Sequence, residues 1–214
     1  MQRNFFSGVE MRAEKIKYFD SRQIGKLRRI VRDKATIAWS KRQPTAIREW
    51  AAIDILTSTG MRVSEVIDLR CGDLNCGYGQ CEIFVRNGKN GKARTIQIQE
   101  SLKTHIRQYI SWKIEREEPI GDDDFLFVGQ RGPWTRQAVQ QMVKKYFKQL
   151  GIYETGKSVH AIRHSYATEL YRNSKDLRAV QKQLGHASIV TTTVYADVTK
   201  EDIRNHLTGM WRNS

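Results

Sequence analysis

The sequence predicts a mainly α-helical domain with one small antiparallel β-sheet, which is an α+β fold class. Three observations lead to this prediction. Apolar residues recur at helical spacing over most of the chain. Residues 81–85 and 96–98 instead alternate apolar and polar side chains on either side of a turn rich in Gly and Asn. With 39% apolar and 28% charged residues, a chain of 214 residues is long enough for one full core.

The predicted domain extends over residues 18–214 and follows a short basic arm, residues 1–17. A first helix begins near Asp20, a favourable N-cap, and carries an apolar stripe at helical spacing. A second helix begins at Pro44, whose fixed backbone angle suits a first turn, and ends at Gly60.

The middle of the chain changes its period. A short helix over residues 64–69 is followed by the two predicted strands. Helical spacing returns over residues 101–116, and the segment GDDDFLFV, residues 121–128, predicts a loop and a short strand. Thr135 is the expected cap of a helix that ends at Gly151. Further helices are predicted at about 158–172, at about 176–184, just before Tyr195 and at about 199–210.

The charge of the chain indicates a polyanionic partner. Lys and Arg number 37 against 23 Asp and Glu, so the formal net charge is +14 and the pI is about 9.9. An excess of this size favours nucleic acid. No apolar run approaches the length of a spanning helix and the amino terminus does not resemble a signal peptide, so we expect no membrane partner.

One helix face gathers several of these positive charges. A basic face is often merely solvated, but the net charge of the chain favours contact with phosphates. We therefore predict a nucleic-acid-binding face on the first helix, formed by Lys26, Arg28, Arg29 and Arg32.

The three cysteines, Cys71, Cys76 and Cys81, lie close together in the sequence. Their odd number and the lack of a secretory signal argue against a disulfide framework. Zinc sites use close C-x-x-C pairs with a second pair of ligands downstream, and this sequence has no such pattern. We therefore expect a reduced, cytoplasmic protein without a bound metal.

Several polar side chains stand where a helix end or a turn can present them to a ligand. Arg62 follows Gly60 in TGMRVSE, and Lys89 lies in the predicted hairpin turn. In HAIRH, His160 and Arg163 share one face of a predicted helix because they are three residues apart. Taken singly, each has an ordinary explanation as a surface residue.

The order and spacing of these residues, with His186 in LGH and Tyr195 nine residues later, clearly resemble the tyrosine recombinase (phage integrase) family. TGMRVSEVIDLR resembles its first arginine box, NGKNGKARTI its lysine hairpin, and HAIRHSYATEL its second box. LGHASIVTTTVYADV resembles the box that ends in the nucleophile. The resemblance covers about residues 20–200 and implies the catalytic-domain fold of that family. All six catalytic positions of the family pattern are filled, by Arg62, Lys89, His160, Arg163, His186 and Tyr195.

The resemblance implies a site-specific DNA recombinase that cleaves and rejoins strands through a 3′-phosphotyrosyl bond, for integration, excision or inversion of a DNA segment. A phenol with a pKa of about 10 is a weak nucleophile, and its attack on a phosphodiester gathers negative charge in the transition state. Arg62 and Arg163 would stabilise that charge, because a planar guanidinium binds two phosphate oxygens at once.

The remaining roles follow from the same resemblance. His160 and His186 would donate hydrogen bonds to the phosphate, and His160 would also take the tyrosine proton. Lys89 would protonate the departing 5′ oxygen, which is general-acid catalysis. The phosphotyrosyl bond retains the energy of the broken linkage, so resealing needs no ATP, metal or other cofactor. Glu65 is expected to support the site, and His164 to support it or, preferably, to pack in the core.

The resemblance also explains why the run from Ala187 to Val194 carries no charged residue. We predict a packed helix there that delivers Tyr195 into a cationic pocket. A carboxylate in that run would compete with the DNA phosphate for the arginines.

The resemblance also implies partners: double-stranded DNA, further copies of the chain in a tetramer on DNA, and accessory DNA-bending proteins, all at the nucleoid. Most relatives carry a helical DNA-clamping domain before the catalytic domain, whereas about 17 residues precede it here. The chain is therefore either a small recombinase that works without the clamp or an excised catalytic domain. Residues 199–214 resemble the tail that partners exchange, and could instead fold back on their own chain.

Other functions share part of this pattern. A type IB topoisomerase cleaves and rejoins strands by the same chemistry, but the tail after Tyr195 and the residues that make up the boxes favour a recombinase. A basic DNA-binding regulator that merely kept these residues is the non-enzymatic alternative, and the complete set of six argues against it. A plain helical structural protein would not explain the spacing.

Overall fold

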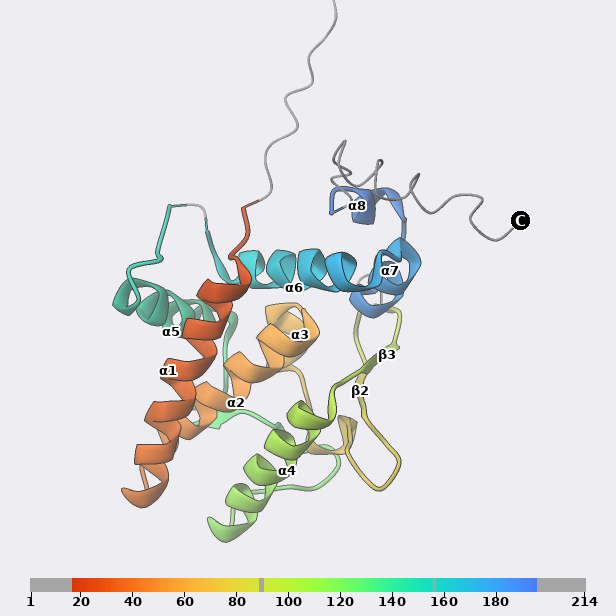
Figure 1. Cartoon of the computed structure of the whole chain (residues 1–214). Coiled ribbons are helices and arrows are strands. Elements are labelled where there is room, and N and C mark those ends of the chain that lie inside the picture. The colour runs from red at the N-terminus through yellow and green to blue at the C-terminus, as the bar shows by residue number, and fades with distance from the viewer. Residues whose placement is uncertain (1–16, 89–90, 156, 196–214) are drawn as a thin grey trace, which may run out of the picture.

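The structure is a computed structural model, which describes residues 17–88, 91–155 and 157–195. The predicted basic arm, Lys89 and the predicted last helix lie outside the described residues, apart from Lys17 at the end of the arm. Within the described part the chain is mainly helical with two small antiparallel sheets, so the predicted fold class is confirmed (Figure 1).

The first two helices, α1 (Ser21–Ser40) and α2 (Pro44–Thr59), pack against each other. Asp20 caps α1, because its carboxylate accepts a hydrogen bond from the amide of Gln23, whose side chain in turn accepts one from the amide of Asp20. Gly60 ends α2 with a φ of 63°, in the left-handed region that favours glycine. Both predicted helix boundaries are confirmed.

The central sheet contains the predicted hairpin. Strands β2 (Glu82–Val85) and β3 (Arg94–Gln97) are antiparallel, and Ile83 pairs with Ile96, both fully buried. A third strand, β1 (Leu74–Asn75), pairs with the other edge of β2 and gives the order β1-β2-β3. The sequence did not predict β1, because two residues are too few to show an alternating pattern.

The predicted strand at the end of the segment 121–128 is largely wrong. Phe125 makes only an isolated bridge, and Val128 alone belongs to a strand, the two-residue β4. Leu126 and Phe127 are both fully buried in the core, which a strand with one solvent-facing side would not allow. The apolar run therefore fills the core instead of extending a sheet.

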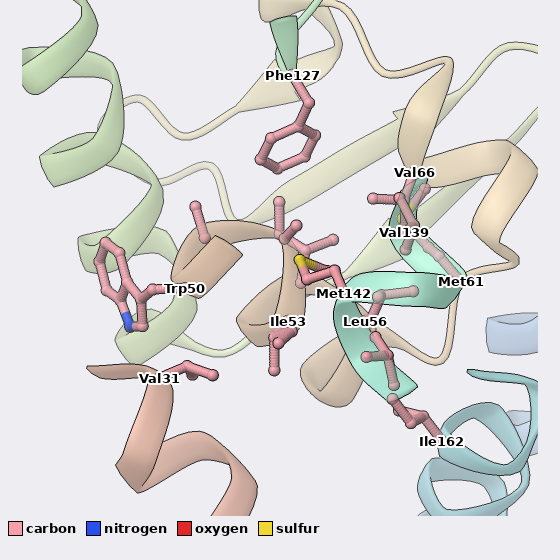
Figure 2. Packing of buried hydrophobic residues seen from close by; sticks show 14 of the residues in the cluster. Val31, Trp50, Ile53, Leu56, Met61, Val66, Phe127, Val139, Met142 and Ile162 are labelled. Atoms are coloured by element: carbon pink, nitrogen blue, oxygen red, sulfur yellow. The ribbon is translucent and has the colours of Figure 1, made fainter. Parts of the chain in front are cut away.

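The helix α2 lies at the centre of the core. Its residues are buried on nearly all sides, and α1, α3, α4 and α6 all pack against it. Figure 2 shows Val31, Trp50, Ile53 and Leu56 within this cluster. The other elements are α3 (Val63–Ile67), the 3-10 turn η1 (Cys71–Asp73), α4 (Glu100–Glu115), β4 (Val128–Gly129), β5 (Gly132–Pro133) and α5 (Arg136–Gln149), which Thr135 caps as predicted.

The last helices form a second, smaller cluster. These are α6 (Val159–Ser174), α7 (Leu177–Leu184) and the single turn α8 (Val190–Thr193), each close to its predicted position. In Figure 1 α6 lies between α1–α3 and the α7–α8 end of the molecule. Ile162 of α6 joins the main core, and Ala167 joins the small cluster. Across the described part of the chain, no helix is both long and apolar enough to span a membrane.

Candidate active site

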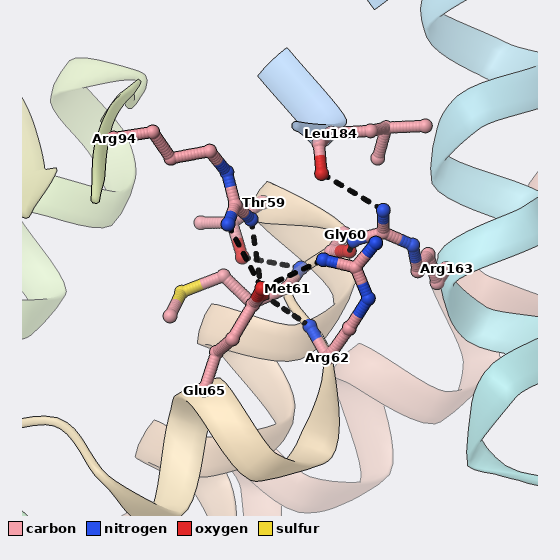
Figure 3. A network of polar contacts seen from close by, with 8 residues as sticks. All are labelled: Thr59, Gly60, Met61, Arg62, Glu65, Arg94, Arg163 and Leu184. Atoms are coloured by element: carbon pink, nitrogen blue, oxygen red, sulfur yellow. Dashed lines mark hydrogen bonds and ion pairs between the residues drawn. The ribbon is translucent and has the colours of Figure 1, made fainter. Parts of the chain in front are cut away.

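A buried carboxylate organises one side of the site. Glu65 is 4% exposed and accepts four hydrogen bonds, two from Arg62 and two from Arg94 (Figure 3). The amide and the guanidinium of Arg62 donate at 2.8 Å each, and the guanidinium of Arg94 donates at 2.8 and 2.9 Å. Burial by itself raises the pKa of Glu65, but the bonds from Arg94 and Arg62 outweigh it and hold the pKa below its ordinary value. Glu65 is therefore an anion at neutral pH.

Arg163 is buried where two helices end. Its guanidinium donates to the carbonyl oxygen of Gly60 at 2.7 Å and to that of Leu184 at 2.8 Å (Figure 3). These carbonyls close α2 and α7, and the C-terminal ends of helices carry partial negative charge. Burial, then the charge of Arg62, lowers the pKa of Arg163 to about 10, so it stays protonated at neutral pH. The two bonds use only part of the five-donor guanidinium.

The two histidines of α6 lie against each other. His160 is exposed, and its ring meets the ring of His164 edge-on, with centroids 4.8 Å apart. Partial burial and the charges of Arg163 and Arg62 lower the pKa of His160. Burial, together with His160 and Arg163, lowers the pKa of His164 to about 4. His164 is therefore neutral at physiological pH.

His186 follows α7 and is tied to the segment before the tyrosine. Its Nδ1 lies 3.0 Å from the hydroxyl of Thr192, which is fully buried. Burial first, and then the charges of Arg163 and Arg62, lowers the pKa of His186 to about 4. A neutral imidazole whose Nδ1 accepts from Thr192 carries its proton on Nε2, where it can serve as a donor.

Tyr195 lies close to these residues. Its side chain is buried, with 7% exposed, and its hydroxyl oxygen lies 2.8 Å from Nδ1 of His164, within hydrogen-bond distance. Its ring is nearly parallel to that of His186, with centroids 6.4 Å apart. Burial raises the pKa of Tyr195, although Arg163 and Arg62 pull it down. The phenol is therefore protonated at neutral pH, and its hydroxyl lies within hydrogen-bond distance of the neutral imidazole of His164.

The short helix predicted before the tyrosine is present as α8, but the prediction that it is packed is wrong. Only Val190–Thr193 is helical, and most of the run from 187 to 194 is exposed, with Val190 69% and Val194 54% accessible. A single turn without a side-chain cap has too few neighbours to bury its apolar residues. Among the described residues from 187 to 195, Thr192 and Tyr195 are the buried ones.

The structure brings five of the predicted catalytic residues into one cluster: Arg62, His160, Arg163, His186 and Tyr195. The sixth, Lys89, lies outside the described residues. On the predicted basic face, Arg28 pairs with the buried Asp54 at 2.8 Å, which engages it in the fold. Lys26, Arg29 and Arg32, the other three members of that face, are exposed.

Sequence reasoning missed two residues here. Arg94 was not singled out, although a buried Glu65 beside one arginine needs further cationic partners. Thr192 was read only as part of an uncharged run, and its hydroxyl gave no signal apart from standing six residues after His186. In the described part of the chain no group of His, Cys, Asp or Glu has metal-site geometry, and the three cysteines are free thiols.

A mainly helical domain that gathers two arginines, three histidines and a buried tyrosine in this way has the layout of a tyrosine recombinase catalytic domain. The chain belongs to the phage integrase family, whose model matches residues 22–202.

Individual relatives agree with this assignment. The chain is 38% identical over 166 residues to tyrosine recombinase XerD of Halalkalibacterium halodurans, covering 77% of this chain and 54% of the relative. It is 36% identical over 159 residues to tyrosine recombinase XerC of Herpetosiphon aurantiacus, covering 74% and 50%. The chain thus spans about half the length of the curated relatives it matches.

Solved structures show the same fold. A crystal structure of XerA recombinase matches with a TM-score of 0.68 and 29% identity, covering 89% of this chain and 62% of that one. The XerH site-specific recombinase bound to its difH substrate, in a pre-cleavage complex, matches with a TM-score of 0.74 and 28% identity. That match covers 92% of this chain and 55% of XerH.

Proposed function

We propose that this chain is the catalytic domain of a site-specific DNA recombinase that cleaves and rejoins strands through Tyr195. The observation that carries the proposal is the position of a buried phenol between a neutral imidazole and two arginines. Its hydroxyl is 2.8 Å from His164, and the charges of Arg163 and Arg62 act on it. The names of the relatives, XerD and XerC recombinases, support the same activity.

The arginines supply transition-state stabilisation. When the Tyr195 oxygen attacks phosphorus, a new P–O bond forms and negative charge grows on the nonbridging oxygens. Arg163 is held on two main-chain carbonyls and Arg62 on Glu65, so neither guanidinium has to reorganise during the reaction. Fixed charges of this kind lower the barrier more than they stabilise the bound substrate.

The reaction needs two proton transfers, one from the attacking tyrosine and one to the leaving 5′ oxygen. The Tyr195 hydroxyl loses its proton to the neutral imidazole that it contacts, which is His164 in this structure, with His160 directly behind it. The P–O5′ bond breaks, and Lys89 gives a proton to the leaving 5′ oxygen. His186, with its proton on Nε2, donates to the phosphate. The 3′-phosphotyrosyl bond is then attacked by another 5′-hydroxyl, and the strand is resealed.

The partner in this proposal is double-stranded DNA. The related XerH site-specific recombinase is bound to its difH substrate in the solved structure. The exposed Lys26, Arg29 and Arg32 would contact phosphates. We further propose assembly as a tetramer on DNA, with DNA-bending accessory proteins, in the cytoplasm at the nucleoid. Tail exchange by residues 199–214 and the basic arm stay predictions, because they lie outside the described residues.

Covalent capture tests the proposal. The full chain is incubated with a random-sequence duplex library, denatured, and the attached DNA is sequenced. A nicked duplex of the recovered site then serves as a suicide substrate, in which the released fragment cannot return. We expect a slow band on a denaturing gel for the natural chain and none for Tyr195→Phe, with duplex binding retained. A slow band from Tyr195→Phe, or none from the natural chain, would contradict the proposal.

A further inference from the structure

Arg94 begins β3, at the end of the hairpin that contains Lys89, and its side chain reaches into the site. Its guanidinium makes two parallel hydrogen bonds to Glu65, at 2.8 and 2.9 Å (Figure 3). Its side chain is 13% exposed and that of Glu65 is 2% exposed. A bidentate arginine–carboxylate pair with so little solvent is geometrically specific. Arg94 is therefore fixed in one orientation.

The same side chain touches the neighbours of two other catalytic candidates. A Cβ atom added at Gly185, just before His186, would lie 2.6 Å from Cδ of Arg94. One added at Gly88, just before Lys89, would lie 3.3 Å from its Nη1. Arg94 thus packs against the main chain on both sides, with no room for a side chain at Gly185. Arg94 therefore contacts three parts of the site: the hairpin at Gly88, the start of α3 at Glu65 and the end of α7 at Gly185.

The charges explain why a second arginine is needed. Glu65 binds Arg62 through its amide and its guanidinium, and without another cation the carboxylate would neutralise Arg62. With Arg94 present, two positive charges face one negative charge, which leaves a net charge of +1 on this trio. A phosphate bound at Arg62 would then face a net positive charge, and not an Arg62–Glu65 pair whose two charges cancel.

We propose that Arg94 is a positioning residue for strand cleavage, which compensates Glu65 so that Arg62 stays available to the phosphate. It also fixes Arg62 relative to the main chain beside Lys89 and His186. The proposal rests on the function proposed above. Arg94 acts through Glu65 and the main chain, and it does not need to touch DNA.

The first test is a substitution that removes the charge. Arg94→Met should lower the single-turnover rate on the nicked suicide duplex by about 10- to 100-fold, as loss of a group that orients a catalytic residue typically does. Duplex binding should change little, so the loss falls on the cleavage step. Arg94→Lys keeps the charge without the bidentate fork and should lose less.

A second substitution separates charge compensation from simple packing. In Arg94→Met the charge of Glu65 is balanced by Arg62 alone, which makes Arg62 less available to the phosphate. Adding Glu65→Gln removes that negative charge and should raise the cleavage rate again, even though it removes another native contact. A merely structural Arg94 predicts the opposite, a double variant slower than Arg94→Met. Should the methionine variant not fold, Arg94→Gln removes the same charge, keeps one hydrogen bond to Glu65 and carries the same test.

The hairpin offers a matched control. Arg86 also pairs with carboxylates, but these are Asp73 at 2.6 Å and Asp123 at 2.8 Å, not Glu65. Arg86→Met should cleave at the natural rate. Equal rates for Arg94→Met and Arg86→Met, or no gain from Glu65→Gln, would overturn the proposal. Failure of the proposed function would look different, because the natural chain would then give no adduct at all.

Discussion

The arginines and the tyrosine of the site are held in different ways. Arg163 is 3% exposed and bound to two helix-ending carbonyls, and Glu65 beside Arg62 accepts four hydrogen bonds. The side chain of Tyr195 is also buried, in a small cluster with Ala167, Val180 and Leu184, but it follows a single turn that is mostly exposed. The cations are therefore supported by packed helices, whereas the proposed nucleophile follows a mostly exposed segment.

This difference fits the separate roles of the arginines and of Tyr195 in the proposed reaction. Charge stabilisation is most effective when the charges are already in place, because reorganising them costs free energy during the reaction. The tyrosine instead has to leave its hydrogen bond to His164 and reach a phosphorus atom. Substitutions in the arginine half should therefore affect both stability and activity, and those in the tyrosine segment activity alone.

The largest effect is expected at Arg163. Arg163→Ala removes a transition-state cation and leaves the carbonyls of Gly60 and Leu184 without donors. Cleavage should fall by at least about 10³-fold, and the free energy of unfolding by about 2–4 kcal/mol. Single-turnover cleavage and urea unfolding measure the two losses. A variant as stable as the natural chain would break the comparison.

The next effect concerns Lys89. Lys89→Ala should slow cleavage of a natural duplex by about 10²-fold or more, because the 5′ oxygen then leaves without a proton. A duplex with a bridging 5′-phosphorothiolate releases a thiolate, which needs no proton, and should restore the rate. The matched comparison is Arg163→Ala, which the sulfur substrate should not rescue. An unrescued Lys89→Ala would remove Lys89 from the general-acid role.

Thr192 tests the tyrosine half with a smaller change. Thr192→Val keeps the buried shape and removes the hydroxyl that holds Nδ1 of His186. Losing this hydrogen bond should slow cleavage by about 10-fold, while the urea midpoint changes little. Thr193→Val is the control, because Thr193 is exposed and its hydroxyl donates to the carbonyl of Val190 within its own turn. Equal rates in the two variants would contradict the role given to Thr192.

The last prediction concerns the pH dependence of stability and not the cleavage rate. His164 and His186 have pKa values of about 4 in the folded chain against an ordinary 6.5. Between these values the unfolded chain binds more protons, so stability is full above pH 6.5 and is lost as the pH falls toward 4. His164→Asn with His186→Asn should shrink the drop in urea midpoint between pH 7 and pH 5. An unchanged drop would show that other groups cause it.

Much of this arrangement was predictable from local sequence. Asp20, Pro44, Thr135 and Gly60 mark helix ends through their own backbone chemistry. The family resemblance predicted that Arg62, His160, Arg163, His186 and Tyr195 lie together, whereas Lys89 stays a prediction. The segment before Tyr195 was mispredicted, because an uncharged run does not reveal whether any neighbour covers it.

The contacts between distant residues were harder to predict. Arg94 lies 29 positions from Glu65 in the sequence, and only the fold shows that the two meet. The hydrogen bond between Tyr195 and His164 likewise depends on how α8 turns back over α6. A pattern identifies the types of residue in a site, whereas the supporting partners are set by packing.

The central claim, that the phenol of Tyr195 attacks phosphorus in front of fixed cations, is tested most directly by the covalent adduct itself. The trapped complex is digested with protease and nuclease, and the remaining peptide–nucleotide conjugate is sequenced by tandem mass spectrometry. The account predicts a single conjugate, a nucleotide attached through its 3′ phosphate to Tyr195. Attachment to any other residue, or through a 5′ phosphate, would contradict it.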